Sequence, residues 1–96
     1  MSGRSVFRFR LYVAGDASNS LQAVANLGAL CRTYLPDRHE IEIVDAFREP
    51  RRALDDRIFM TPTLLKLGPH PPLRIVGTLS QTPTVLQALG LAPIAA

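Results

Sequence analysis

The sequence predicts an α/β domain with the element order βαβαββα, and three observations support this order. Residues 6–15 alternate apolar and polar side chains, which is typical of a strand. Residues 20–35 carry apolar side chains at helical spacing, and residues 40–46 alternate again. A strand, a helix of about 16 residues and a second strand favour a right-handed unit with two parallel strands.

The first strand has two different faces. One face carries only apolar side chains, and we expect it to lie against a helix-covered core. Its residues are Phe7, Phe9, Leu11 and Val13. The other face contains two arginines, which predict that this side of the sheet is partly exposed. Its residues are Val6, Arg8, Arg10 and Tyr12.

The first helix is expected to follow a turn at residues 15–20. Its N-cap is one of three residues whose side chains can accept a hydrogen bond from the helix backbone: Ser18, Asn19 or Ser20. The expected buried stripe is Leu21, Val24, Leu27, Gly28 and Cys31, extended by Leu35 and stopped by Pro36. A glycine inside a helix costs up to about 1 kcal/mol relative to alanine. We expect close contact between helix and sheet at Gly28 to compensate.

The second half predicts a short helix, a hairpin and a final helix. Pro50 suits the first turn of the short helix, on which Leu54 and Ile58 lie one turn apart. Residues 64–67 and 73–77 form an antiparallel hairpin across a proline-rich turn. The last helix is expected from Ser80 to Leu89. In it Thr82 is the cap, Pro83 the start, and the inward residues are Val85, Leu86 and Leu89. This order, with a proline directly before the third strand, resembles that of a thioredoxin-type domain.

Composition favours one small globular domain without a metal or cofactor. The 96 residues are 47% apolar and 20% charged, and we treat residues 1–96 as a single domain with a core over about residues 6–91. No apolar stretch is long enough to span a membrane and no leader opens the chain, which predicts a cytoplasmic protein. The net charge of +3 is too small and too scattered to indicate nucleic acid. Cys31 is the only cysteine, and it lacks metal-ligand spacing with His39 and His70.

The position of the thioredoxin redox turn holds Asp16-Ala17-Ser18-Asn19-Ser20 instead of a cysteine pair. These groups either cap the helix or bind the backbone of a partner or an anion. Cys31 lies on the apolar stripe and is interpreted as an inert core residue. No catalytic arrangement is present in the sequence, so we predict a protein that is not an enzyme and that recognises other proteins.

Thr61-Pro62 precedes the third strand, and its peptide bond is either cis or trans on local sequence alone. In thioredoxin-like domains a cis proline at this place shapes a surface that binds extended peptide.

A pattern of short motifs extends over nearly the whole chain, from about residue 6 to residue 91. It includes Leu11-Tyr12-Val13-Ala14-Gly15, Asn19-Ser20, Asp45, Pro50, Asp56, and Thr61-Pro62-Thr63-Leu64 followed by Lys66. It continues with Pro69, Pro71, Arg74-Ile75, Gly77, Leu79-Ser80, Val85-Leu86, Leu89 and Leu91. In this combination the chain resembles the KaiB family of circadian clock proteins. Gln22, Ala25 and Glu42 stand where clock-type members commonly carry basic residues, so the chain is interpreted as a divergent member.

The resemblance implies a non-enzymatic regulator that binds a KaiC-type ATPase or a related histidine kinase. It implies a partner-binding set of Asp56, Arg57, Lys66 and Arg74. The family is metamorphic: its C-terminal half has a second arrangement that packs into dimers or tetramers. Thr61, Pro62 and Thr63 lie near the start of the segment that switches.

Several alternatives stay open at this point. The C-terminal half could adopt the family's rearranged ground-state fold. The charged site residues could serve only to solubilise the domain. The protein could be a thioredoxin-like redox relative without a cysteine pair, or a structural homo-oligomer.

Overall fold

The computed structural model describes residues 5–91, and its elements follow the predicted order. The N-terminal half contains β1 (Phe7–Val13), α1 (Ser18–Tyr34) and β2 (His39–Asp45). The C-terminal half contains α2 (Pro50–Asp55), β3 (Thr63–Gly68), β4 (Leu73–Val76) and α3 (Thr82–Ala88). Among these residues, no helix is both long and apolar enough to cross a bilayer.

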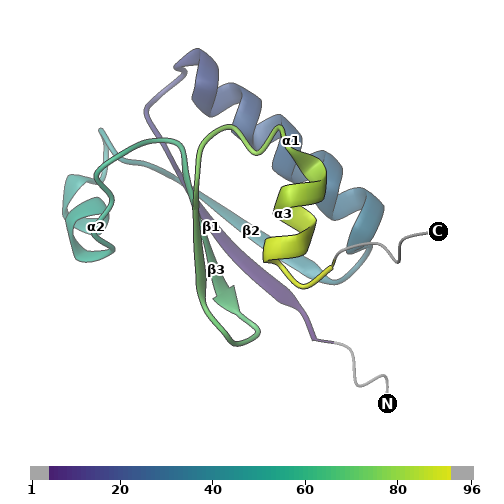
Figure 1. Ribbon diagram of the computed structural model, residues 1–96. Coiled ribbons are helices and arrows are strands. Elements are labelled where there is room, and N and C mark those ends of the chain that lie inside the picture. The colour runs from purple at the N-terminus through teal and green to yellow at the C-terminus, as the bar shows by residue number, and fades with distance from the viewer. Residues whose placement is uncertain (1–4, 92–96) are drawn as a thin grey trace.

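The four strands form one sheet with the order β2-β1-β3-β4. β1 pairs with β2 in parallel, and β3 pairs antiparallel with both β1 and β4. α1 and α3 cover one face of the sheet, and α2 lies on the other near the end of β1 (Figure 1). This arrangement confirms the predicted thioredoxin-like α/β fold rather than the rearranged alternative.

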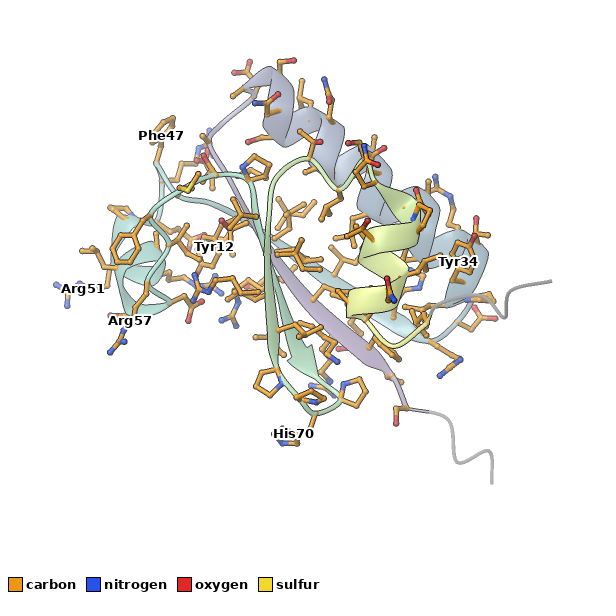
Figure 2. All side chains as sticks on the ribbon, in the orientation of Figure 1. Tyr12, Tyr34, Phe47, Arg51, Arg57 and His70 are labelled. Carbon is orange, nitrogen blue, oxygen red and sulfur yellow. The ribbon has the colours of Figure 1, made fainter. Side chains whose placement is uncertain are left out.

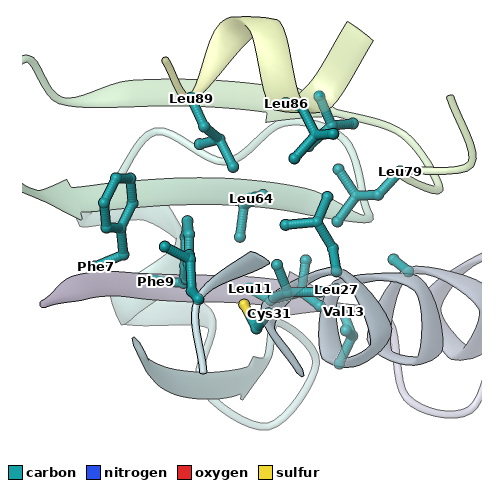
Figure 3. Close-up of a cluster of buried hydrophobic side chains, with 14 residues drawn as sticks. Phe7, Phe9, Leu11, Val13, Leu27, Cys31, Leu64, Leu79, Leu86 and Leu89 are labelled. Carbon is teal, nitrogen blue, oxygen red and sulfur yellow. The ribbon is translucent and has the colours of Figure 1, made fainter. Parts of the chain in front are cut away.

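The main core lies between the sheet and the helices α1 and α3 (Figure 3). The predicted inward face of β1 is confirmed: all four of its apolar residues are buried there. The opposite face is partly exposed, as predicted, because Arg8 is exposed and Arg10 half-buried. Tyr12 differs, since α2 covers it and it is fully buried in a second, smaller cluster with Val44 and Leu65.

The start of α1 corrects two predictions. The N-cap is Ala17, and no side chain caps the helix. The hydroxyl of Ser20 instead accepts a hydrogen bond from the Ala14 backbone N–H at 3.0 Å, which ties the helix to the end of β1. With Ser20 turned inward, the buried stripe is rotated and Leu21 is exposed. The buried helix residues are Ser20, Ala23, Leu27, Leu30 and Cys31.

Gly28 does not mark close contact between helix and sheet. A Cβ atom there would meet only the Arg32 guanidinium, with 3.2 Å to Nη1. Arg32 is an exposed residue of the same helix, so the expected helix-to-sheet compensation is wrong.

α3 is shorter than predicted, and Thr82 is its first residue rather than its cap. Leu79 explains the difference, because it is buried in the main core with a left-handed φ of 63°. The chain must therefore turn before the helix can begin. The predicted inward positions of α3, Val85, Leu86 and Leu89, are all buried.

Candidate protein-binding surface

Four large apolar side chains lie exposed around α2. They come from the loop before the helix, from the helix itself and from the segment after it: Phe47, Leu54, Phe59 and Met60. Phe59 is 82% exposed and Phe47 77%. All four line one groove, so they are contiguous, and we call them the apolar patch. A contiguous exposed group of this kind indicates a surface that binds a partner, whereas isolated exposed apolar residues are ordinary.

Two grooves border each other along Phe59 and Met60, which line both. The groove along α2 has a volume of about 420 Å³. The other, of about 350 Å³, reaches β3 and β4. It is completed by Arg57, Thr63, Arg74 and Val76. Figure 2 shows Phe47, Arg51 and Arg57 around α2 at the same end of the molecule.

The turn that ends α2 determines the position of Phe59 and Met60, the two residues that line both grooves. The Ile58 backbone N–H donates to the Ala53 carbonyl at 2.8 Å, and the Arg57 N–H donates to the Leu54 carbonyl at 3.0 Å. Arg57 itself has a left-handed φ of 57°. This is the Schellman pattern of helix termination, in which one left-handed residue reverses the chain. Ile58, the residue after Arg57, packs in the smaller core, and Phe59, the next residue, points into solvent.

Asp56 anchors the same turn to the sheet. Its Oδ2 accepts hydrogen bonds from the Tyr12 hydroxyl at 2.6 Å and from Arg10 Nη1 at 2.9 Å. The Tyr12 hydrogen bond, aided by Arg10, holds the pKa of the Asp56 carboxyl below its ordinary value. Burial, with the neighbouring Asp56, raises the pKa of Tyr12 to about 12. The Asp56 side chain is therefore turned toward β1.

Arg74 reaches the turn from β4. Its Nη2 donates to the Asp56 carbonyl at 2.6 Å, and its Nη1 donates to the Arg57 carbonyl at 2.9 Å. Thr61-Pro62 is cis, and the Pro62 carbonyl accepts the Gly77 N–H at 2.9 Å just beyond β4. Gly68-Pro69 and His70-Pro71 are also cis.

The structure brings together most of the sequence-predicted site residues. Asp56, Arg57 and Arg74 meet at the end of α2, and Thr63 lines the same groove as the two arginines. Lys66 lies apart from them. It is only 4% exposed, on the main-core side of β3, with its Nζ 5.6 Å from the centre of the Phe7 ring. In this fold the Lys66 side chain is therefore buried beside Phe7.

Sequence reasoning missed the apolar patch. It predicted only that Leu54 and Ile58 lie one turn apart on the short helix; in the structure Leu54 is exposed, while Ala53 and Ile58 are buried. Phe59 and Met60 received no role. The available signal was two large apolar residues directly before Thr61-Pro62, in a segment without helical or strand periodicity.

The surface offers binding groups and little reactive chemistry. Cys31 is buried away from it in the main core, and burial raises the pKa of its thiol to about 11. Within residues 5–91, no cluster of histidine, cysteine or acidic side chains is arranged to hold a metal ion. In the loop replacing the redox turn, residues 16–19 are exposed. The groups that remain for recognition are apolar side chains rimmed by arginines.

The fold and this surface define the class: a thioredoxin-like domain with an exposed apolar patch beside α2 and no cysteine pair in its sequence. A family profile described as the KaiB domain matches residues 10–91. The chain therefore belongs to the KaiB family of circadian clock proteins.

The sequence relatives agree with this assignment. The chain is 42% identical to the circadian clock protein KaiB3 of Synechocystis sp., over 88% of this chain and 82% of that protein. It is 37% identical to the circadian clock oscillator protein KaiB of Prochlorococcus marinus, over 95% of this chain and 78% of that protein.

Solved structures show the same fold at low identity. The N-terminal domain of Synechococcus elongatus SasA matches with a TM-score of 0.72 at 17% identity, over all of this chain and 94% of that one. A chloroplastic thioredoxin z matches with a TM-score of 0.73 at 18% identity, over 94% of this chain and 81% of that one.

Proposed function

We propose that this protein is a non-enzymatic regulatory module that binds a KaiC-type ATPase or a related signalling kinase. Membership of the KaiB family supports a role in clock-type signalling. The single observation that carries the binding role is the apolar patch, whose residues are exposed and contiguous beside α2. The proposal also places the protein in the cytoplasm, where a lone thiol such as Cys31 stays reduced.

The proposed contact combines apolar burial with charge. Burying a large apolar side chain contributes about 1.5–3 kcal/mol, so a few such residues can dominate an interface. Arg57 stands at the rim of the groove beside Phe59. It supplies electrostatic selection, favouring a partner that offers carboxylates at this rim. Most exposed single charges contribute little by themselves.

A binding experiment tests the role of the patch. The protein is mixed with a KaiC-type ATPase from the same genome, in ATP or in ADP, and the complex is measured by size-exclusion chromatography with light scattering. We expect a nucleotide-sensitive complex that Phe59→Ser weakens by at least about tenfold, as for a buried aromatic anchor.

Leu67→Ser is the matched control, because Leu67 is an exposed apolar residue at the far end of β3. It should leave the complex unchanged. Equal binding by Phe59→Ser and wild type would remove the patch from the interface. No complex in either nucleotide would contradict the assignment of an ATPase partner.

A structural homo-oligomer is the second candidate, because the same patch could bind another copy of the chain. The mass of the protein alone, measured in the same runs, separates the two readings. A dimer or tetramer that Phe59→Ser dissociates would favour self-assembly. A concentration-independent monomer would contradict it.

We extend the proposal to fold switching, which the resemblance to the KaiB family motivates. The switching segment would begin near Thr61-Pro62-Thr63, after β1, α1 and β2. Slowly exchanging NMR spectra should then contain two sets of resonances for residues 61–91 and one set for residues 7–45. A single set throughout, at every temperature and concentration tested, would contradict a populated second fold.

A further inference from the structure

α2 ends on a residue that is poorly suited to its backbone conformation. Arg57 occupies the left-handed position of the Schellman turn with φ 57°. Glycine is the usual residue there, because a Cβ atom crowds the following carbonyl in this conformation. Contacts from residues outside the turn are therefore needed to stabilise this backbone conformation.

The hydrogen bonds within the turn do not engage the backbone carbonyls of Asp56 and Arg57. The two N–H groups of the motif satisfy the carbonyls of Ala53 and Leu54. The carbonyls of Asp56 and Arg57, the two residues that follow the helix, both accept hydrogen bonds from the Arg74 guanidinium. A guanidinium presents paired donors in a rigid plane, so one side chain holds both carbonyls in a fixed relation. Its positive charge also suits the negative end of a helix.

Two strands of the sheet, β1 and β4, contact this turn from different sides. β1 holds the Asp56 carboxylate through Arg10 and Tyr12, while β4 holds the backbone through Arg74. Arg74 belongs to β4, an edge strand of four residues, so its hydrogen bonds to Asp56 and Arg57 connect the edge of the sheet to the turn that precedes Phe59 and Met60.

We propose that Arg74 is a positioning residue that maintains the left-handed turn at Arg57 and thereby sets the place of Phe59 and Met60. The inference rests on the proposed function for its consequence in partner binding. It replaces the expectation that Arg74 contacts the partner directly, because both of its terminal nitrogens already donate to the turn. Arg57, by contrast, projects from the same turn into solvent (Figure 2).

Amide hydrogen exchange on the full chain tests this role without any partner. In Arg74→Ala, the Ile58 and Arg57 amides should exchange at least about tenfold faster, because their hydrogen bonds close the turn. The β1 amides, such as that of Leu11, should keep their wild-type rates. Arg74→Lys keeps the charge but not the planar fork, so it should restore only part of the protection.

Arg57→Gly provides the rescue. Glycine adopts the left-handed conformation at little cost, so the double variant Arg57→Gly/Arg74→Ala should regain slow exchange at Ile58. Arg51→Ala is the charge control, since Arg51 is an exposed arginine of the same helix, and it should leave the turn unaffected. Unchanged exchange in Arg74→Ala, equal acceleration at β1, or failure of the glycine rescue would each overturn the proposal.

Binding to the KaiC-type ATPase is a second, independent measurement. Arg74→Ala should weaken that complex together with the loosened turn. Weakened binding with the Ile58 amide still protected would show that Arg74 contacts the partner directly, which overturns the positioning role. If wild type forms no complex, the proposed function fails, and hydrogen exchange still decides what Arg74 does.

Discussion

Gly28 lies in the middle of α1, where glycine lowers helix stability without an evident structural reason. An added Cβ would approach Arg32 Nη1 at 3.2 Å and no part of the sheet. The Arg32 guanidinium is the far end of a flexible, exposed side chain, so a small movement relieves the contact. Close packing therefore does not require glycine at this position.

We accordingly expect Gly28→Ala to raise the free energy of unfolding by about 0.5–1 kcal/mol, the difference in helix propensity. Urea denaturation followed by circular dichroism measures it. Ala29→Gly is the reverse control, because Ala29 is an exposed neighbour on the same helix and its replacement should destabilise by a similar amount. A loss of stability in Gly28→Ala would mean that Arg32 cannot move aside.

At the level of elements, the strands were the easiest to predict. The alternation in β1 has a direct physical cause, since one face of a strand packs on the core and the other does not. The sequence could not show that α2 folds over Tyr12, because that contact joins residues 40 or more positions apart. Tyr12 was therefore placed on a partly exposed face although it is fully buried.

Helix ends were predicted less well, and side-chain chemistry explains why. Ser18, Asn19 and Ser20 can all cap a helix in isolation, yet the Ser20 hydroxyl bonds the end of β1 instead. α2 ends on a left-handed Arg57 and α3 follows a left-handed Leu79. Neither residue type signals such a conformation, because both turns are stabilised by tertiary contacts rather than by local preference.

Only part of the candidate site could be predicted from the sequence, because tertiary contacts decide which side chains are exposed. The family pattern identified Arg57 and Arg74, which the fold brings together. It also identified Lys66, which the fold buries against Phe7. Phe59 and Met60 became recognisable only once the end of α2 was seen to direct them into solvent.

For the whole molecule, one charge network joins three elements on the α2 side of the sheet. Arg10 of β1 contacts Glu42 of β2 at 2.8 Å and Asp56 after α2 at 2.9 Å, and Arg52 of α2 also reaches Glu42 at 2.8 Å. Hydrogen bonds from Arg10 and Arg52 lower the pKa of Glu42, as those from Tyr12 and Arg10 lower that of Asp56. The folded state thus binds fewer protons at these carboxyls than the unfolded state does.

These pKa shifts predict that stability falls at both ends of the pH range. Carboxyls with a lowered folded pKa stabilise the protein above their ordinary pKa near 4, and this contribution disappears as the pH falls through the lowered values. Tyr12 behaves oppositely, because its pKa rises from about 10 unfolded to about 12 folded. Its contribution is complete below pH 10 and is lost between pH 10 and 12, by about 2 kcal/mol.

Urea denaturation at closely spaced pH values measures both limits. Asp56→Asn should lose less stability than wild type as the pH falls into the acid range. Tyr12→Phe should lose less stability than wild type between pH 10 and 12, while its free energy of unfolding at neutral pH should be lower by about 1 kcal/mol because a hydrogen bond is lost. Tyr34→Phe is the matched control, because Tyr34 is a partly exposed tyrosine at the end of α1. If Tyr12→Phe loses as much stability as wild type between pH 10 and 12, the hydroxyl of Tyr12 is not buried beside Asp56 in solution. The network would then not tie α2 to the sheet as the structure shows.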